Sequence, residues 1–542
     1  MIVVFLYYPA FHGTFVFDDF PNIVNNYETM LKNLSFSSLW QALTSTHGGI
    51  RPFAHLSFAL NYYFFGLDPF YYHLINIFIH IVNSILVYFL LKDIYLNFYN
   101  DENYLLVSSF GSVLFSIATI QTSAVSYIVQ RMALGMTLFS LLTLLMFMKK
   151  RYVTAFVFWL IALGFKENAA LIPFIILLYL WVVRNKSKVV FGVSCVVVVL
   201  LVMLFLFSPM LNFYDKIVNG YAHRPFTLTE RLLTEPRVIL HYFSLILFPL
   251  YSRFSLHYGF TLSANLFTPV STFFSILILL FVFLYGVISK NKWLSFWILF
   301  IFITLSLESS IIPLDIAYEH RMYFPMVGVS AVFGYLVAIF KNKKIVYGVA
   351  VFFLLFSAFN TFVRNMQFRS YETILLQDYK NYPTNSRMLH NLFAIYLKKG
   401  EKNKSYFYLC KSLENNSFYY NDYIDFANLI VEKSSIDDGI RYLKNTFKTK
   451  RKINKPYLIL WKIAKLYEKK EDFKRAEQYY LLALKIQKKS VKVFRDYGLL
   501  LFNTGHYKKG YEYMKKAYNI NKQEPIVRYY LKEMEQVQIF LR

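Results

Sequence analysis

Cysteine is scarce in this sequence. The 542 residues include two cysteines, Cys195 in a long apolar run and Cys410 in a polar region. Two cysteines placed in this way exclude a disulfide framework and a cysteine-based metal site. A basic segment is also missing before the first apolar run, residues 1–17, so this run does not have the pattern of a cleaved signal peptide. We interpret it as a short first membrane span or as the remainder of a truncated one.

Charged residues are scarce as well, and they are unevenly placed. Only 17% of the residues are charged, whereas 56% are hydrophobic. Residues 1–365 contain a succession of uncharged apolar runs, such as 189–207 and 273–289, and no such run occurs from 366 onward. Runs of this length can cross a hydrocarbon core of about 30 Å as helices. The sequence therefore predicts an all-α protein with a polytopic membrane domain, 1–365, and a soluble domain, 366–542.

Acidic residues are outnumbered by basic ones throughout the chain. Residues 366–542 hold 35 Lys and Arg against 18 Asp and Glu, and residues 1–365 hold 23 against 14. A basic surface of this kind favours an anionic lipid surface or an acidic partner. Neither a zinc-ligand spacing nor an RNA-binding signature is present, so we expect no nucleic-acid partner.

Clusters of Lys and Arg between the apolar runs set the expected orientation. The positive-inside rule places the clusters at 149–151, 184–188, 290–292 and 341–344 in the cytoplasm. Residues 237–250 are apolar but short, and we interpret them as a re-entrant or interfacial helix. The first outer loop, 18–70, and residues 366–542 then lie outside. About eleven spans are expected: 1–17, 71–97, 104–120, 127–148, 152–165, 169–183, 189–207, 270–289, 293–311, 323–340 and 345–363.

The soluble region carries an internal repeat of 34 residues. Small and aromatic residues recur at the positions that are typical of a tetratricopeptide unit. Four degenerate repeats and a terminal helix are predicted, and arrays of such helix pairs form an α-solenoid that commonly holds a peptide. The repeated positions include Ala464, Tyr467, Ala476, Tyr480 and Ala483, then Gly498, Leu501, Gly510, Met514 and Ala517, with Phe393 and Ala427 earlier in the chain.

Two adjacent carboxylates, Asp18 and Asp19, follow the first apolar run. An acid at the membrane interface, partly desolvated, is suited to take a proton from a polar acceptor. The alternative is an interfacial cap or a salt-bridge partner. A second polar feature, the stripe His73, Asn76 and His80, lies on one face of a predicted span. Such a stripe faces either a cavity or another helix.

Basic side chains also gather in the predicted outer segments. They either bind lipid headgroups or hold the anionic group of a lipid-linked substrate, whose departing phosphate fixed Arg and Lys residues would stabilise. The cations are Arg51, Arg131, Lys166, Arg237 and Arg321, and they are accompanied by Glu167, Glu319 and His320.

Several motifs, taken together, resemble bacterial relatives of the transmembrane, tetratricopeptide-repeat O-mannosyltransferases, which belong to the GT-C class of polyprenyl-phosphate-sugar glycosyltransferases. Where such relatives often carry His-Pro before "IQT", this chain has Ala118 and Thr119. The motifs, in chain order, are "FVFDD", "RPFAHLSFALNYYFFG", "YHLINIFIH", "IQTSAVSYIVQRMA", "FKENAALIP", "LTEPRVILHYFSLILFP" and "ESSIIPLDIAYEHRMYFP".

The resemblance implies an inverting transfer of a sugar from a polyprenyl phosphate to an acceptor hydroxyl outside the cytoplasmic (inner) membrane. It implies that Asp18, or its neighbour Asp19, is the catalytic base, and that Arg131, Lys166 and Arg321 bind the donor phosphate. Possible supporting residues are Arg51, His73, His80, Glu167, Arg237, Glu319 and His320.

The resemblance implies no metal cofactor, although Asp18, Asp19 and Glu319 leave a divalent ion open. The expected partners are the lipid-linked sugar, membrane lipids and an acceptor protein held by the repeats. Two alternatives remain: transfer of the sugar to a lipid or an envelope glycan, and a non-catalytic, membrane-anchored repeat scaffold.

Overall fold

The computed structural model describes residues 1–44, 51–99, 101–186, 217, 219–221, 224–450, 452–522 and 524–540. The chain divides into two compact units, Met1–Pro383 and Thr384–Arg542. Helices make up the secondary structure of the described residues, and no β-strand is found among them. The prediction of an all-α fold is confirmed.

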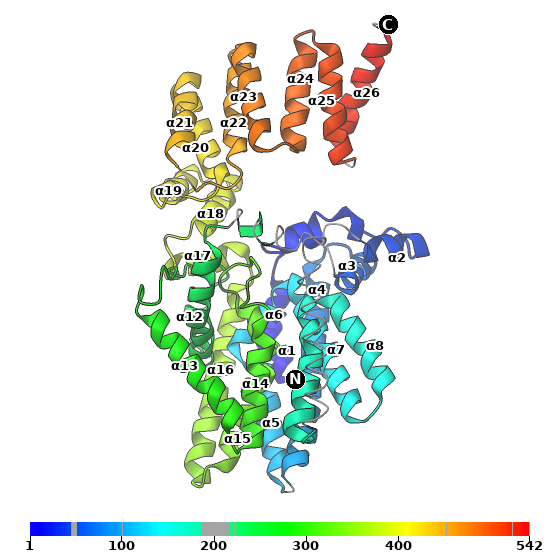
Figure 1. Cartoon of the computed structure of the whole chain (residues 1–542), viewed down its shortest axis with the longest axis vertical. Coiled ribbons are helices and arrows are strands. Elements are labelled where there is room, and N and C mark those ends of the chain that lie inside the picture. The colour runs from blue at the N-terminus through cyan, green and yellow to red at the C-terminus, as the bar shows by residue number, and fades with distance from the viewer. Residues whose placement is uncertain are drawn as a thin grey trace. The chain divides into compact units, whose positions relative to one another are not determined.

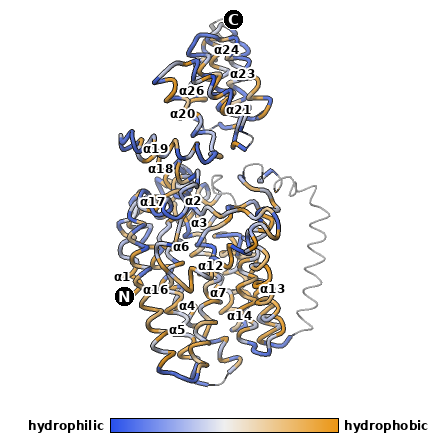
Figure 2. The backbone as a smooth tube through the Cα atoms, turned by 90° about the vertical axis from the view of Figure 1, so that its left-hand side faces the viewer, coloured by the Kyte–Doolittle hydropathy of each residue, from blue (hydrophilic) through white to orange (hydrophobic). Residues whose placement is uncertain are grey.

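The first unit contains the predicted apolar helices (Figures 1 and 2). Each predicted span except 189–207, which lies outside the described residues, coincides with one of them. Four are long and apolar enough to cross a membrane: α4 (Pro69–Phe98), Ile128–Met148 with α7 (Arg131–Met148), α13 (Ser271–Ile288) and α16 (Lys343–Gln367). α5 (Asn103–Ile117) with Thr119–Val125 forms a bent pair, and the shorter apolar helices are Ile2–His12, α8 (Tyr152–Phe165), Glu167–Val183, α14 (Lys292–Ser306) and α15 (Pro325–Ile339).

Asparagine side chains cap the N-termini of two of these helices, at the clusters of basic residues that we predicted to be cytoplasmic. The Asn291 side chain accepts a hydrogen bond from the Leu294 N–H at the start of α14, and Asn342 accepts one from the Ile345 N–H at the start of α16. Such caps satisfy backbone donors that a helix start leaves unpaired. The polar sequence between apolar runs therefore determines where these helices begin.

Small residues allow α5 and α15 to pack closely. A Cβ at Gly334 of α15 would lie 2.5 Å from the Val107 carbonyl oxygen, and a Cβ at Gly111 of α5 would lie 3.1 Å from the Ser330 carbonyl oxygen. Close backbone approach at small residues is the usual way in which apolar helices associate in a membrane, because lipid gives them no hydrophobic drive to associate.

Helix α12 (Leu228–Leu247) contains most of the segment that we predicted as an interfacial helix. It begins with a capping box formed by Thr227 and Glu230, and it is not among the helices that are apolar enough to span. Its first half is polar and its second half is apolar. This helix supplies Arg231 and Glu235 to a cluster of charged side chains that is described below.

The first unit continues beyond the last apolar helix. Helix α17 (Tyr371–Asn381) is attached to it by Asp378, whose carboxylate accepts hydrogen bonds from the N–H groups of Leu256, at 2.9 Å, and His257, at 3.0 Å. The domain division that we predicted at 365 falls inside α16, whereas the compact unit ends at Pro383.

The second unit consists of helix pairs and a terminal helix, as the repeat predicts (Figure 1). Gly498 and Gly510 lie on consecutive helices. A Cβ added to either glycine would lie within 3 Å of the carbonyl oxygen of the other glycine. The small residues of the repeat therefore mark close contacts within a pair. The helices are α18 (Ser386–Lys398), α19 (Lys402–Glu414), α20 (Tyr420–Lys433), α21 (Ile436–Thr449), α22 (Tyr457–Lys469), α23 (Phe473–Ile486), α24 (Val491–Asn503), α25 (Tyr507–Ile520) and α26 (Pro525–Phe540).

Candidate active site

The two adjacent acids lie in a turn that the rest of the unit holds in place. Phe17 has a φ of 43°, a left-handed backbone conformation that is uncommon for an aromatic residue. The next backbone N–H, of Asp18, donates a hydrogen bond to the Tyr127 hydroxyl at 2.9 Å. The Asp19 carboxylate accepts hydrogen bonds from the N–H groups of Val16, at 2.8 Å, and Val129, at 2.7 Å. The turn is therefore joined to residues 127–129.

The surroundings of the two carboxylates differ. Asp19 is fully buried, and each of its two oxygens is already hydrogen-bonded to a backbone N–H. Burial raises the pKa of Asp19 to about 8, against the opposing effect of the two N–H donors. Asp18 is half-buried. A group that takes a proton from a substrate must be reachable, so the geometry favours Asp18 as the base and a structural role for Asp19.

Arg131 is enclosed by the protein. Its side chain is fully buried, and its guanidinium donates to the side-chain oxygens of Asn76 and Asn61, both at 2.8 Å. It also donates to the carbonyl oxygens of Ser57, at 3.2 Å, and Tyr72, at 3.1 Å. A guanidinium has five N–H donors, and most of these are used here. This geometry argues against a direct phosphate contact and for a positioning role beneath the first outer loop.

The polar stripe on α4 contacts neighbouring segments of the unit. The Asn76 side chain donates to the carbonyl oxygens of Val125 and Ile128, and His80 lies 2.8 Å from the Tyr323 hydroxyl and 3.0 Å from the Ser116 carbonyl oxygen. These contacts support the helix-to-helix interpretation for Asn76 and His80.

His73, the first residue of the stripe, and Asn83, which follows the stripe on α4, are also buried. Asn83, one turn beyond His80, donates to the same Tyr323 hydroxyl at 3.1 Å. Both ring nitrogens of His73 are buried and without a hydrogen-bond partner in the described part of the chain. A Cβ at Gly13 would lie 2.9 Å from His73 Nε2, so glycine is needed at that position to let the chain pass the ring.

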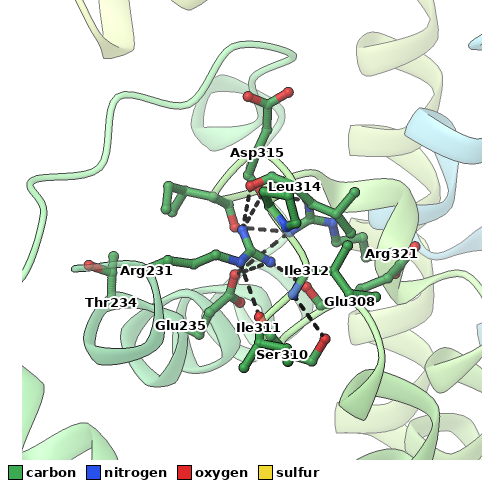
Figure 3. A network of polar contacts seen from close by, with 12 residues as sticks. Arg231, Thr234, Glu235, Glu308, Ser310, Ile311, Ile312, Leu314, Asp315 and Arg321 are labelled. Atoms are coloured by element: carbon green, nitrogen blue, oxygen red, sulfur yellow. Dashed lines mark hydrogen bonds and ion pairs between the residues drawn. The ribbon is translucent and has the colours of Figure 1, made fainter. Parts of the chain in front are cut away.

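A cluster of charged side chains joins helix α12 to the loop after α14 and to the segment before α15 (Figure 3). Lys166 Nζ lies 2.5 Å from Glu308 Oε1, and both side chains are almost fully buried. Arg231 Nη2 lies 2.8 Å from Glu235 Oε1, and Arg321 Nη1 lies 4.0 Å from the same oxygen. We call these five residues the charged cluster. Its three cations and two carboxylates leave it with one excess positive charge.

The arginines of the charged cluster also hold the loop that follows α14. Arg231 donates to the carbonyl oxygens of Glu308 and Leu314, at 2.5 and 2.6 Å, and Arg321 donates to those of Asp315 and Ile316, at 2.5 and 2.9 Å (Figure 3). A loop with this many carbonyl oxygens near the membrane needs donors. The cluster therefore has a structural role as well as its excess charge.

Lys166 and Arg321 were predicted from the sequence as site residues. Arg231, Glu235 and Glu308 were not predicted. A signal was present in the sequence. Arg231 and Glu235 are four residues apart on a helix, where opposite charges pair, and Glu308 ends a long apolar run.

His320 neighbours both Tyr127, which holds the Asp18 turn, and Arg321 of the charged cluster. The centroid of its ring lies 6.4 Å from that of Tyr127. The ring stacks on Tyr318, with 5.1 Å between the two centroids. Burial, together with the nearby charges of Lys166 and Arg321, holds the pKa of His320 well below its usual value. A neutral imidazole therefore lies beside the tyrosine that holds Asp18, on the side of the cations.

Glu319 has different neighbours from His320. Its carboxylate accepts hydrogen bonds from the Ser255 N–H, at 2.8 Å, and the Tyr258 hydroxyl, at 2.5 Å, and lies 4.0 Å from Arg364. Burial raises the pKa of Glu319 to about 7, against the opposing effect of Arg364 and the two donors. Glu319 therefore holds the 255–258 segment.

The remaining predicted cations are partly neutralised or bonded to loops. Arg51 forms a double hydrogen bond with Glu167, at 2.9 and 2.6 Å, on the half-exposed side of the unit. Arg237 donates to the Thr261 carbonyl oxygen at 2.7 Å. The charge of Arg51 acts on His320, where it helps to lower the pKa of the imidazole.

Across the described residues, no group of three or more His, Cys, Asp or Glu side chains is arranged to hold a metal ion. Asp18, Asp19 and Glu319, which we considered together, do not meet. Asp19 accepts from Val16 and Val129, whereas Glu319 accepts from Ser255 and Tyr258.

Comparison with known proteins finds one family model and several curated relatives that match parts of the chain. Residues 458–490, which include most of α22 and all of α23, match the model of the tetratricopeptide repeat family. A crystal structure of the APC/C hetero-tetramer Cut9-Hcn1 matches with 12% identity, covering 80% of this chain and 84% of that chain, at a TM-score of 0.26. A TM-score this low carries no argument about the fold.

Curated relatives match part of the chain. The chain is 34% identical over 171 residues to the protein O-mannosyl-transferase tmtc2 of Xenopus laevis, which is 30% of this chain and 20% of that protein. It is 28% identical over 233 residues to the protein O-mannosyl-transferase F38B6.6 of Caenorhabditis elegans, which is 41% of this chain and 31% of that protein. It is 26% identical over 253 residues to human TMTC3, which is 45% of this chain and 26% of that protein. The matches thus span about a fifth to a third of those relatives. Over part of its length, the chain is similar to animal protein O-mannosyl-transferases.

Proposed function

We propose that this protein is a membrane glycosyltransferase that moves a sugar from a polyprenyl phosphate to a hydroxyl of an extracytoplasmic protein. The observation that carries the proposal is the placement of Asp18. Asp18 is half-buried in a turn that Tyr127 holds, the ring of His320 lies 6.4 Å from that of Tyr127, and the charges of Lys166 and Arg321 act on His320. The similarity to protein O-mannosyl-transferases supports the choice of reaction.

The proposed chemistry is a single displacement at the sugar. Asp18 takes the proton of the acceptor hydroxyl as its oxygen attacks the anomeric carbon, and the bond from that carbon to the phosphate oxygen breaks. Attack from the side opposite the phosphate inverts the anomeric centre. A positioned base contributes about 10²–10⁴-fold to such a step.

The departing lipid phosphate gains negative charge, which Lys166 and Arg321 would stabilise. Fixed charges in a site shielded from water are effective here because they need no reorganisation during the reaction. In the described structure Lys166 is paired with Glu308, so phosphate would compete with this carboxylate for the lysine. Arg131, which the sequence placed in this group, acts in the proposal by positioning the residues around Asp19.

The repeats would bring the acceptor protein to the membrane. Holding an acceptor on an attached domain turns its encounter with the site into an intramolecular event and raises its effective concentration. Their match to the tetratricopeptide repeat family supports a role in protein binding.

The test uses full-length protein in detergent, polyprenyl-phosphate hexoses and extracytoplasmic proteins of the host. Mass spectrometry would detect a hexose on Ser, Thr or Tyr of an acceptor. Asp18→Asn should reduce transfer about 10²–10⁴-fold. The control is Asp68→Asn, since Asp68 caps α4 with a side-chain oxygen that asparagine also has.

Each outcome decides between the candidates. Equal transfer by wild type and Asp18→Asn would overturn the role of Asp18. Transfer to lipid or glycan with unmodified proteins would replace the proposed acceptor. Absence of transfer with every donor, with partner proteins still bound to the repeats, would favour a scaffold.

A further inference from the structure

A groove of about 700 Å³ lies on the repeat unit, between helices α23 and α25. Both helices pack against α24, which lies between them in the chain (Figure 1). We call this hollow the α23–α25 groove. Two adjacent side chains that line it, Leu481 and Leu482, are 39% and 42% exposed. Exposed aliphatic side chains that lie together mark a site of interaction more often than scattered ones do. The apolar part of the lining consists of Leu481, Leu482, Leu484, Phe494 and Tyr513.

The charged side chains of this groove are basic. Among the described residues that line it, the charged ones are Lys485, Lys488 and Lys516, and no carboxylate accompanies them. We call these three the groove lysines. All three are exposed, and Lys516 Nζ lies 4.4 Å from the centroid of the Tyr513 ring. The groove therefore combines an apolar lining with positive charge.

The groove lysines differ from other lysines of the repeat unit. Lys465 Nζ lies 2.6 Å from a Glu468 oxygen, and Lys470 Nζ lies 2.6 Å from an Asp437 oxygen. The ion pairs found in the described part of the unit involve other residues than the groove lysines. Like charges that line one groove repel each other, and an anionic partner would relieve that repulsion.

The groove lies on a different side of α24 from a polar set that α24 shares with α22. The Trp461 indole N–H donates to Asp496 at 2.8 Å, and Lys492 Nζ lies 3.7 Å from the centroid of a Trp461 ring. Asp496 follows Phe494 by two residues, which places the two side chains about 200° apart around α24. The groove is therefore a surface separate from the one where α22 and α24 meet.

We infer that the α23–α25 groove binds an acidic, amphipathic segment of a partner protein. Apolar side chains of the segment cover Leu481, Leu482 and Phe494, and its carboxylates pair with the groove lysines. An amphipathic helix that lays its apolar face into a groove is a common form of peptide recognition.

Charge and shape favour this occupant over two others. A second copy of the repeat unit would bring like charges together, because residues 384–542 hold 33 Lys and Arg against 16 Asp and Glu. An anionic bilayer surface is flatter than a hollow between two helices. The inference does not depend on the proposed sugar transfer, so Asp18→Asn should bind the segment as wild type does.

The test measures binding of a labelled peptide to the full-length protein in nanodiscs of zwitterionic lipid. The probe is a peptide of Leu and Glu, about 16 residues long, with Leu at helical spacing. Fluorescence anisotropy gives its affinity. Wild type should bind this peptide more tightly than a peptide with Ser in place of Leu, and more tightly than one with Lys in place of Glu.

Charge reversal tests the lysines. Lys485→Glu combined with Lys488→Glu and Lys516→Glu should weaken binding of the Leu/Glu peptide about tenfold or more. The same variant should gain binding of the peptide in which Lys replaces Glu. These residues are exposed, so the substitutions should leave the fold intact, and thermal unfolding of each variant checks this.

A matched control makes the same change in net charge elsewhere on the unit. It combines Lys402→Glu, Lys433→Glu and Lys448→Glu, at exposed lysines of α19, α20 and α21 that do not line the groove. This variant should bind the Leu/Glu peptide like wild type, because salt screens exposed charges that are far apart.

A further variant tests the apolar lining. Leu481→Ser combined with Leu482→Ser removes its exposed part and should weaken binding of the Leu/Glu peptide about tenfold.

Three results would overturn the inference. One is absence of binding of the Leu/Glu peptide to folded wild type. Another is equal weakening by the groove and control charge reversals, which would show general attraction to a basic unit. The third is binding of phosphatidylglycerol vesicles that prevents binding of the peptide and is lost in the groove variant, which would make the groove a lipid surface.

Discussion

At the scale of single residues, side chains of the same type have different surroundings. Asp18 and Asp19 are neighbours in the chain, yet one is half-buried and the other is fully buried with both oxygens bonded. The left-handed backbone of Phe17 turns the chain between Val16 and Asp19. Because that turn is anchored at Tyr127 and Val129, the position of Asp18 depends on its neighbour.

Alanine substitutions at the two positions should separate these roles. Asp19→Ala leaves the N–H groups of Val16 and Val129 without an acceptor, and each unpaired buried donor costs about 1–3 kcal/mol. Asp18→Ala keeps the backbone hydrogen bond to Tyr127, so it should unfold close to the wild-type temperature and lose transfer. Thermal unfolding in detergent measures the difference. Equal unfolding temperatures for the two variants would contradict it.

At the scale of elements, most side chains of the charged cluster lie in the segments between apolar helices. Lys166 follows α8, Glu308 follows α14 and Arg321 precedes α15, and their contacts join segments that are far apart in the sequence. Helix α12 adds Arg231, which fastens the loop after α14 through its carbonyl oxygens. These contacts bring together the side chains of the charged cluster from four separate segments.

The pair Lys166–Glu308 should be strongly coupled. Both side chains are at most 7% exposed, and removal of one partner of a buried pair costs about 3–5 kcal/mol because a charge is left uncompensated. Lys166→Met should therefore destabilise the protein more than Lys166→Met combined with Glu308→Gln. Unfolding of the wild type, both single variants and the double variant gives the coupling. Additive effects would show that the pair is not formed.

At the scale of the whole molecule, composition separates an apolar unit from a strongly basic repeat unit. Residues 384–542 hold 33 Lys and Arg against 16 Asp and Glu. The topology predicted from basic clusters places this unit outside the cytoplasm, the side to which the outer loop with Asp18 is also assigned. An extracytoplasmic acceptor requires this placement.

Cys410 allows the topology to be tested. It is an exposed, free cysteine on α19 of the repeat unit. A membrane-impermeant maleimide should label it in intact spheroplasts, and Cys410→Ser should abolish the labelling because the other cysteine, Cys195, belongs to the predicted span 189–207. Labelling that appears only after the membrane is permeabilised would place the repeats in the cytoplasm.

The sequence by itself determined the features that depend on local physics. Apolar runs predicted the helices of the first unit, since a hydrophobic segment long enough to span must satisfy its own backbone as a helix. The 34-residue repeat predicted the helix pairs of the second, because each small residue marks a close contact inside one pair. Much of the fold was therefore predictable. The sequence also singled out acids and cations for a candidate site, and their roles stay predictions.

Only the tertiary structure decided what those polar residues do. Burial and partners come from distant segments: Asn61 and Asn76 surround Arg131, backbone N–H groups occupy Asp19, and Glu308 pairs with Lys166. Spacing along a chain cannot report such contacts, because they depend on how helices separated by many residues come together.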